Sequence, residues 1–275
     1  MKTSNRTNFF PRAICILVAA CGLLSTMKMG AGERSVSPDR CIRNWWRAEA
    51  NASDMVGGQN GILKNGAGYA DGMVGLAFNF NQCANNYVEA THDDTLNFGT
   101  GDFTIETWVN FRSWNPSGSY DQPDAIFIGV DEGSGETSKW FFAIHANMLT
   151  FHINSPTLGP KWMVDAPFAP EINQWYHLAV TRKNGVFTMY VNGLAIGNQA
   201  SFDAVPAPNA PLTIGQCEGL GFIDGLMDET TIYTCALSPA EIQAIYGAGS
   251  KGKRPTGKSI RANQGQILKT GPKAV

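Results

Sequence analysis

The chain has 275 residues, with 21 Lys and Arg against 23 Asp and Glu, 30 glycines and 11% aromatic residues. This length suits one large β domain or two small ones. Only 16% of the residues are charged, which, with the glycine and aromatic content, argues against a coiled coil, a helical solenoid or a disordered chain. Residues 35–249 carry nine basic and 22 acidic side chains, whereas both ends are basic. Because an acidic body repels phosphate backbones, we expect no nucleic-acid partner.

The N-terminus has the pattern of a targeting segment. Three basic residues precede the apolar run 13–24, which has the length of a secretory h-region and is short for a membrane span. We therefore predict a signal peptide over residues 1–31, with cleavage near Ala31. The stretch ending in Ala20 and Cys21 also resembles a bacterial lipoprotein box, and in that alternative the signal ends at Ala20 and a lipid on Cys21 attaches the domain to a membrane. A third alternative retains the segment as an anchor. All three predict a secreted or extracytoplasmic domain.

The cysteines are consistent with export. Six are present, and two of them lie in the targeting segment. The other four are Cys41, Cys83, Cys217 and Cys235. An even number in an oxidising compartment indicates two disulfides, with three connectivities open. The alternative is free, buried thiols. None of the spacings is typical of a zinc site.

From residue 42 onward, short β-type runs alternate with Gly, Asn, Pro and Asp, which is typical of an all-β protein. Residues 103–111 show the period of two that places alternate side chains on opposite faces of a strand. Asn184-Gly185 and Asn192-Gly193 supply the positive φ angles of tight hairpins, so 174–198 is predicted to be a three-stranded meander. The predicted strands are 43–48, 74–80, 86–90, 103–111, 125–130, 139–145, 148–154, 174–182, 186–192, 212–215 and 222–233.

One helix is predicted near the C-terminus. Ser238 can cap it, Pro239 suits its first turn, and Glu241 completes a capping box. Gly247 can end it. Residues 250–275, with seven basic and no acidic side chains, are predicted to be a flexible basic tail.

About a dozen strands in a body of about 210 residues favour two large sheets in a jelly-roll arrangement over a minimal immunoglobulin-type sandwich. The fold class is therefore predicted as an all-β, two-sheet antiparallel jelly-roll sandwich with one short C-terminal helix.

Five segments in order carry a family resemblance: NWWRAEANASDMVGGQNGILKNGAGYADGMVGLAFNF, FTIETWVNF, QWYHLAVTRKNGVFTMYVNG, LTIG and GLMDETTIYTCALSPAEIQAIY. Together they resemble the bacterial LamG-like jelly-roll domain of the concanavalin A-like lectin/glucanase superfamily, with laminin G and pentraxins as distant relatives. The resemblance covers residues 42–247. It implies two antiparallel sheets, one of them concave, and an extracellular role in binding glycans, glycoproteins or other surfaces.

The resemblance also implies which cysteines pair. In this family the first and last strands lie side by side and antiparallel, which would place Cys41 opposite Cys235. Cys83 would then remain for Cys217.

Calcium is a further implication of the family. Relatives often carry an Asp-Asp-Tyr run after the LAFNF-like strand, where this chain has Asn85-Asn86-Tyr87. Amide oxygens can bind calcium but bring no charge. Asn85 and Asp228 are therefore the predicted calcium ligands, and the alternative is that they only order a turn and a loop.

The catalytic signals are weak. Laminarinase-type hydrolases of this superfamily carry a Glu-x-Asp-x-x-Glu run, and here the strand 103–111 offers Glu106 alone. Asp228 and Glu229 are adjacent, so in an extended strand they point to opposite faces, although either could meet Glu106 across strands. His145 and His152 lie on successive predicted strands but are more typical of structural histidines than of a metal pair. We therefore predict no enzymatic activity.

Aromatic residues in loops are the candidate ligand contacts. Trp114 and Tyr120 lie in the long polar loop 113–124, and Trp162 stands beside Lys161 near another loop. We expect these three to bind ligand at the rim of the sandwich, although a loop tryptophan can equally fold back over the sandwich edge. The acidic body favours neutral or cationic ligands.

The sequence thus predicts an exported, non-catalytic module that recognises a carbohydrate, glycoprotein or cell-surface ligand, with calcium as the one cofactor considered. A structural or adhesive surface module without glycan binding is the alternative, and a divergent glycoside hydrolase is the third.

Overall fold

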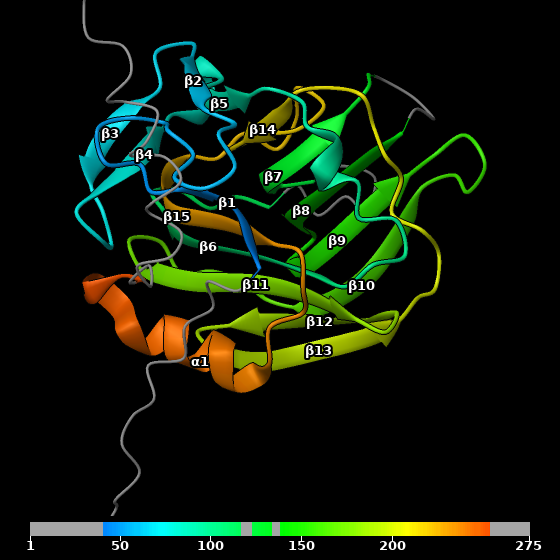
Figure 1. The fold of residues 1–275 in the computed structure, drawn as a ribbon. Helices are drawn as coiled ribbons and strands as arrows, with labels where there is room; N and C mark the ends of the chain where they lie inside the picture. Colours follow the sequence, from blue (N-terminus) through cyan, green and yellow to red (C-terminus); the bar gives the residue numbers. More distant parts are fainter. Residues whose placement is uncertain (1–40, 117–122, 134–137, 254–275) are drawn as a thin grey trace, which may run out of the picture. The chain divides into compact units, whose positions relative to one another are not determined.

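Fifteen strands form two antiparallel sheets in the computed structural model, which describes residues 41–116, 123–133 and 138–253 (Figure 1). These residues all lie in one compact unit, residues 35–275. The eight-stranded sheet has the order β13 (Leu194–Ala200), β12 (Val186–Val191), β11 (Trp175–Lys183), β6 (Phe103–Phe111), β15 (Gly225–Tyr233), β4 (Leu76–Phe80) and β3 (Gly68–Asp71), with β1 (Ile42–Trp46) also paired to β15. The seven-stranded sheet has the order β10 (Lys161–Pro167), β9 (Met148–Asn154), β8 (Lys139–His145), β7 (Ala125–Asp131), β14 (Leu212–Ile214), β5 (Tyr87–Ala90) and β2 (Gly61–Lys64).

The two sheets share one apolar core, as a sandwich requires. In β6, Phe103 and Ile105 are fully buried in this core, as the period of two predicts. The ring of Phe103 packs on Phe151 of the facing sheet at 5.3 Å between centroids, and Phe151 packs on Phe187 at 5.6 Å. The all-β jelly-roll sandwich with a short C-terminal helix is confirmed.

The predicted meander is also confirmed. Asn184 and Gly185, with φ of 50° and 77°, join β11 to β12, and Asn192 and Gly193, with φ of 51° and 79°, join β12 to β13. The residues that flank each turn pair with each other across the two strands: Lys183 with Val186, and Val191 with Leu194. Positive φ at both central positions is the reason for the Asn-Gly sequence.

The two ends of the domain are joined covalently. β1 runs antiparallel to β15, with Trp45 opposite Thr231, and a disulfide links Cys41 to Cys235 just outside the paired strands. This arrangement agrees with the pairing that the family resemblance implies. The bond closes a loop with a sequence separation of 194 residues.

The helix α1 (Pro239–Ala248) covers part of the outer face of the eight-stranded sheet (Figure 1). Ser238 and Glu241 form the predicted capping box. Ile242 and Ile245 pack with Tyr233 and other outer-face residues. Three 3₁₀ helices complete the described elements: η2 (Gln82–Ala84), η3 (Asp94–Leu96) and η4 (Gly249–Lys251). Among the described residues, no helix has the length and apolar character to cross a membrane.

Lys253 returns to the same outer face, although the sequence places it in the tail. Its side chain is only 5% exposed. Its ammonium group donates to Glu106 Oε1 at 2.6 Å, to the carbonyl oxygen of Glu229 at 3.0 Å and to Thr231 Oγ1 at 2.9 Å. The fold therefore extends at least to Lys253, beyond the boundary at residue 247 that the sequence indicates.

Glu106 is the centre of this buried network. Its Oε2 lies 3.0 Å from His177 Nε2, and its Oε1 also accepts a hydrogen bond from the Tyr233 hydroxyl at 3.1 Å. Burial alone would raise the pKa of Glu106, but Lys253 and His177 outweigh burial and lower the pKa to about 2. Glu106 is thus a buried carboxylate that stays ionised because its neighbours compensate its charge.

Replacing both Cys41 and Cys235 by Ser is expected to lower the free energy of unfolding by about 4–5 kcal/mol, because the long loop they close restricts the unfolded chain. Chemical denaturation under non-reducing conditions measures this difference. Cys83→Ser, at an exposed free thiol, is the control and should leave stability unchanged. A double variant that unfolds at the same denaturant concentration as the wild type would contradict the assignment.

Lys253→Met is expected to lower the free energy of unfolding by about 3–5 kcal/mol, because it leaves the Glu106 charge buried without a cation. Lys251→Met, two residues away and exposed, is the matched control. The Glu106 pKa is lower in the folded protein than its ordinary value of 4.5, so its stabilising contribution is present above about pH 4.5 and is lost as the pH falls towards 2. The difference between wild type and Lys253→Met should therefore shrink over that window. A difference in unfolding free energy that stays constant from pH 4.5 to 2 would contradict this role of the Glu106 charge.

Candidate functional site

The outer face of the seven-stranded sheet carries a row of adjacent residues that crosses six strands. In β8, Trp140, Phe142 and Ile144 face the core, so that Phe141 and its alternate neighbours face outward. Strand pairing places the following residues side by side, in spatial order: Glu89 of β5, Thr213 of β14, Gly129 of β7, Phe141 of β8, His152 of β9 and Trp162 of β10. A ligand on this face would meet residues from strands far apart in the sequence.

The loop between β14 and β15 lies over the middle of this row. Cys217 is 1% exposed and sits above Gly129, where the Cβ of any larger residue would come within 2.9 Å of the Cys217 sulfur. The loop is held by hydrogen bonds between the backbones of Cys217 and Leu220 and by one from the Ile126 amide to the Gly221 carbonyl. It divides the row into a pocket on one side and an aromatic cluster on the other.

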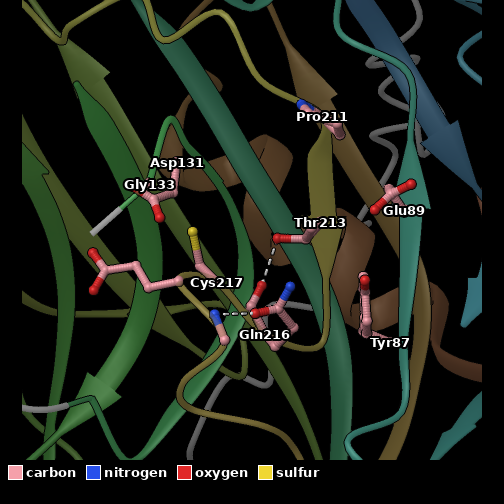
Figure 2. Close-up of a pocket in the computed structure, with 10 residues that line it drawn as sticks. Tyr87, Glu89, Asp131, Gly133, Pro211, Thr213, Gln216 and Cys217 are labelled. Atoms are coloured by element: carbon pink, nitrogen blue, oxygen red, sulfur yellow. Dashed lines mark hydrogen bonds between the residues drawn. The ribbon is translucent and has the colours of Figure 1, made fainter. Parts of the chain in front are cut away.

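The pocket has a volume of about 320 Å³ and lies over β5, β14 and the end of β7 (Figure 2). Polar side chains supply much of its wall: Tyr87, Glu89, Asp131, Thr213, Gln216 and Glu218. The loop side is fixed by two hydrogen bonds, from Thr213 Oγ1 to the Gln216 carbonyl at 2.7 Å and from the Gly219 amide to Gln216 Oε1 at 2.8 Å. The loop wall of the pocket is therefore held by hydrogen bonds within the protein.

The charges around the pocket are partly paired. Lys139, 4% exposed, contacts both Asp131 and Glu218, and Glu89 pairs with Lys64 at 2.8 Å. Burial raises the pKa of the Cys217 thiol, so that this sulfur is neutral and not an activated nucleophile. The wall offers hydrogen-bonding groups with a negative excess, and its described residues do not form a catalytic triad.

The aromatic cluster is centred on Trp162. Its indole stacks on the His145 ring, with centroids 3.9 Å apart and planes 7° apart, and its centroid lies 4.3 Å from that of His152. His145 Nε2 lies 3.2 Å from Asp165 Oδ1. Burial, followed by the charges of Lys139 and His145, lowers the pKa of His152 to about 3, so its imidazole is neutral. Burial alone would raise the pKa of Asp165, but hydrogen bonds from His145 and Thr150 keep it below its ordinary value.

The candidate ligand residues from the sequence fall in different places. Trp162 lies in β10, which is not among the strands predicted from the sequence, and it belongs to the outer-face row. Trp114 is half-buried at the sandwich edge, where its ring packs edge-on against Phe111 at 5.2 Å and its Nε1 donates to Asn147 Oδ1 at 3.2 Å. It lines a cavity of only about 30 Å³. Tyr120 lies outside the described residues.

The predicted calcium ligands contact different segments of the chain. Asn85 ends η2, where its carbonyl accepts a hydrogen bond from Asn65 Nδ2. Asp228 is buried in β15, and its Oδ2 accepts from the Val74 amide at 2.8 Å. Burial raises the pKa of Asp228 to about 8, which favours the neutral acid over a cation-binding carboxylate. In the described part of the chain, no three His, Cys, Asp or Glu side chains are grouped to hold a metal ion. Calcium binding stays a prediction.

The second predicted disulfide is wrong. Cys83 and Cys217 are both free thiols. Cys83 is exposed in η2, whereas Cys217 is enclosed by Phe141 and Ile126 on the outer face of the seven-stranded sheet. Counting cysteines cannot distinguish such a buried thiol from half of a disulfide.

Glu106 and Glu229 do approach each other, but through a shared cation. Glu106 Oε1 lies 2.6 Å and Glu229 Oε2 3.5 Å from the Lys253 ammonium, and the two side chains are 0% and 2% exposed. Trp45 Nε1 also donates to Glu229 Oε2 at 3.0 Å. The adjacent Asp228 is not part of this cluster, because its Oδ2 accepts a hydrogen bond from the Val74 amide. With its low pKa, Glu106 has no proton to donate as a general acid at neutral pH.

The pocket residues carry little signal in the sequence. Tyr87 belongs to the Asn85-Asn86-Tyr87 run, which indicated a calcium site and not a pocket, and no motif marks Asp131 or Thr213 in their strands. Only the alternation in each strand signals that they face outward, and only the strand order brings them together.

Trp114→Ala is expected to lower the free energy of unfolding by about 1–3 kcal/mol, because the edge-on contact with Phe111 and the hydrogen bond to Asn147 are lost. Thermal melting and glycan binding should be measured on the same sample. Lost binding with an unchanged melting temperature would contradict the packing role and support Trp114 as a ligand anchor.

Comparisons with known proteins agree with this architecture. Domain 4 of AbnA, a GH43 extracellular arabinanase from Geobacillus stearothermophilus solved in complex with arabinotriose, superposes with a TM-score of 0.59 at 19% identity, covering 74% of this chain and 97% of that one. The binding domain of Paraclostridial Mosquitocidal Protein 1 gives a TM-score of 0.63 at 17% identity, covering 77% and 53%. The binding domain of botulinum neurotoxin DC in complex with SialylT gives 0.58 at 17%, covering 77% and 52%.

The chain thus spans nearly all of the arabinanase domain and about half of each binding domain. At these identities the similarity establishes the fold. No curated protein sequence matches significantly. The family model of the concanavalin A-like lectin/glucanases superfamily matches residues 82–243, which is more than half of the sequence. The chain therefore belongs to the concanavalin A-like lectin/glucanase superfamily.

Proposed function

We propose that this domain is an exported, non-catalytic module that binds carbohydrate on the outer face of its seven-stranded sheet. The observation that carries the proposal is the pocket of about 320 Å³, which stands on rigid strands and is walled by Tyr87 and several hydrogen-bonding groups. Sugars combine apolar ring faces with hydroxyl groups, so a pocket with one aromatic side and polar edges is complementary to them.

Trp162 is a second contact in this proposal. It lies on the same face, at the far end of the row from Glu89, and one side of its ring is supported by His145. A pre-organised indole loses little freedom when a ligand packs against it. An oligosaccharide would contact the pocket with one part and reach towards Trp162 with another.

The comparisons support a glycan partner in general. Domain 4 of the arabinanase and the binding domain of neurotoxin DC share the fold and were solved with arabinotriose and SialylT. The Cys41–Cys235 disulfide supports export, because such bonds persist in oxidising compartments. The non-catalytic role rests on Glu106 and Glu229, which are buried around Lys253.

A glycan array with the wild-type protein, followed by calorimetry on the best ligand, tests the proposal. Tyr87→Ala is expected to weaken binding at least tenfold, because aromatic side chains in pockets dominate binding energies. Phe202→Ala is the matched control, since Phe202 is 75% exposed and does not line the pocket. Incubation with the bound polysaccharide should release no reducing ends.

Three results would contradict the proposal. Binding to no glycan by a folded protein would favour the structural or adhesive module. If Tyr87→Ala and Phe202→Ala changed the affinity for the ligand equally, the binding site would lie outside the pocket. Reducing ends released by the wild type would favour a hydrolase.

A further inference from the structure

An irregularity in β10 places an aromatic ring and a carboxylate together on the outer face of the seven-stranded sheet. Trp162 pairs with His152 of β9 and Asp165 pairs with Thr150, so three steps along β10 correspond to two steps along β9. The register shift that causes this lies between Trp162 and Val164. Without the shift, residues three apart would point to opposite faces of the sheet. Bulges re-aim side chains in this way and are frequent next to active sites.

One buried histidine contacts both of these side chains. His145 is fully buried, and its ring stacks on the Trp162 indole with centroids 3.9 Å apart. Its Nε2 lies 3.2 Å from Asp165 Oδ1. His152 flanks the indole at 4.3 Å between centroids. These contacts restrict the ring and the carboxylate, so a ligand that binds them has less side-chain freedom to remove.

Both side chains are open to solvent in part. The Asp165 side chain is 30% exposed, and Trp162 is half-buried, with His145 stacked on one face of its ring. Their partners in β9 are two residues apart, which corresponds to about 7 Å along the strand. A single sugar ring can contact an aromatic face and a carboxylate at this separation. The pair therefore offers an apolar surface and a hydrogen-bond acceptor to the same ring.

Asp165 accepts hydrogen bonds and does not donate them at neutral pH. Burial raises the pKa of Asp165, but hydrogen bonds from His145 and Thr150 outweigh burial and keep the pKa below its ordinary value. The side chain is therefore an ionised carboxylate, and such a group only accepts. Its natural partners on a sugar are hydroxyl groups.

This pair lies at a distance from the pocket. Four strand steps separate Trp162 of β10 from Thr213 of β14, which at about 4.8 Å each gives about 19 Å. The loop that carries Cys217 above Gly129 lies between them. A disaccharide in the pocket is too short to reach the indole, whereas a longer oligosaccharide that passes over or beside this loop can contact both places.

We propose that Trp162 and Asp165 form a second sugar subsite, which binds one ring of an oligosaccharide whose other end occupies the pocket. The indole contacts the apolar face of that ring, and the Asp165 carboxylate accepts hydrogen bonds from its hydroxyl groups. The inference rests on the proposed glycan-binding function and adds the length of ligand that the domain prefers and the residues that select it.

Calorimetry with a disaccharide and a hexasaccharide of the sugar that the glycan array selects tests the inference. The wild type is expected to bind the hexasaccharide about tenfold more tightly or better, because the second contact is made within an already bound ligand. Trp162→Ala is expected to remove this gain and to leave the affinity for the disaccharide unchanged, which also shows that the pocket of the variant is intact. Trp162→Phe keeps an aromatic face and should retain most of the gain.

Asp165→Asn removes the charge but keeps the size of the side chain. It is expected to weaken binding of the hexasaccharide about fivefold, because hydrogen bonds to an ionised acceptor are stronger than neutral ones, and to leave the disaccharide unaffected. Glu171→Gln is the matched control, since it removes one charge from an exposed position in the loop after β10 and should change neither affinity. Melting temperatures show whether each variant is folded.

Four outcomes overturn this inference and leave the proposed function standing. They are a wild type that gains nothing from the longer ligand, a folded Trp162→Ala that keeps the gain, a Trp162→Ala that loses affinity for both ligands equally, and a folded Asp165→Asn that binds like Glu171→Gln. If a folded wild-type protein binds no glycan at all, the proposed function fails and this inference fails with it.

Discussion

The alternation of side chains along each strand is the constraint on which the rest of the structure depends. Because successive side chains point to opposite faces, the aromatic residues that fill the shared core leave the remaining positions of both sheets facing outward. The two outer faces then differ in what lies over them. On the eight-stranded sheet, α1 and Lys253 bury the polar residues of the strands, whereas the seven-stranded sheet keeps a pocket. The topology thereby leaves the pocket on the outer face of the seven-stranded sheet.

Two buried carboxylates show the difference between these faces. Both carboxylate oxygens of Glu106 have hydrogen-bond partners, which are His177, Tyr233 and Lys253. The contact with Lys253 holds the end of the described chain against the sheet. Asp131 lies against a lysine that is closer to another carboxylate, and one of its oxygens accepts no hydrogen bond. The Glu106 network is therefore complete, whereas Asp131 keeps one buried oxygen without a hydrogen bond.

The features that local sequence could predict are those with local causes. The alternation in β6, the two Asn-Gly hairpins and the Ser238 capping box each depend on neighbouring residues, and all were found. The Cys41–Cys235 bond came from the family resemblance. Lys253 was assigned to a tail because its partner Glu106 is 147 residues away. The pocket was missed for the same reason, since Tyr87, Asp131 and Thr213 meet only when β14 inserts between β5 and β7.

The proposed function places ligand binding on the outer face of the seven-stranded sheet. Backbone amide chemical shifts, recorded while the best oligosaccharide from the array is titrated into the protein, test this claim directly. We expect the largest changes on β5, β14, the end of β7 and the loop at residues 216–219, with smaller ones near Trp162. Changes concentrated on α1, β6 and β11, or at the edge around Trp114, would contradict it.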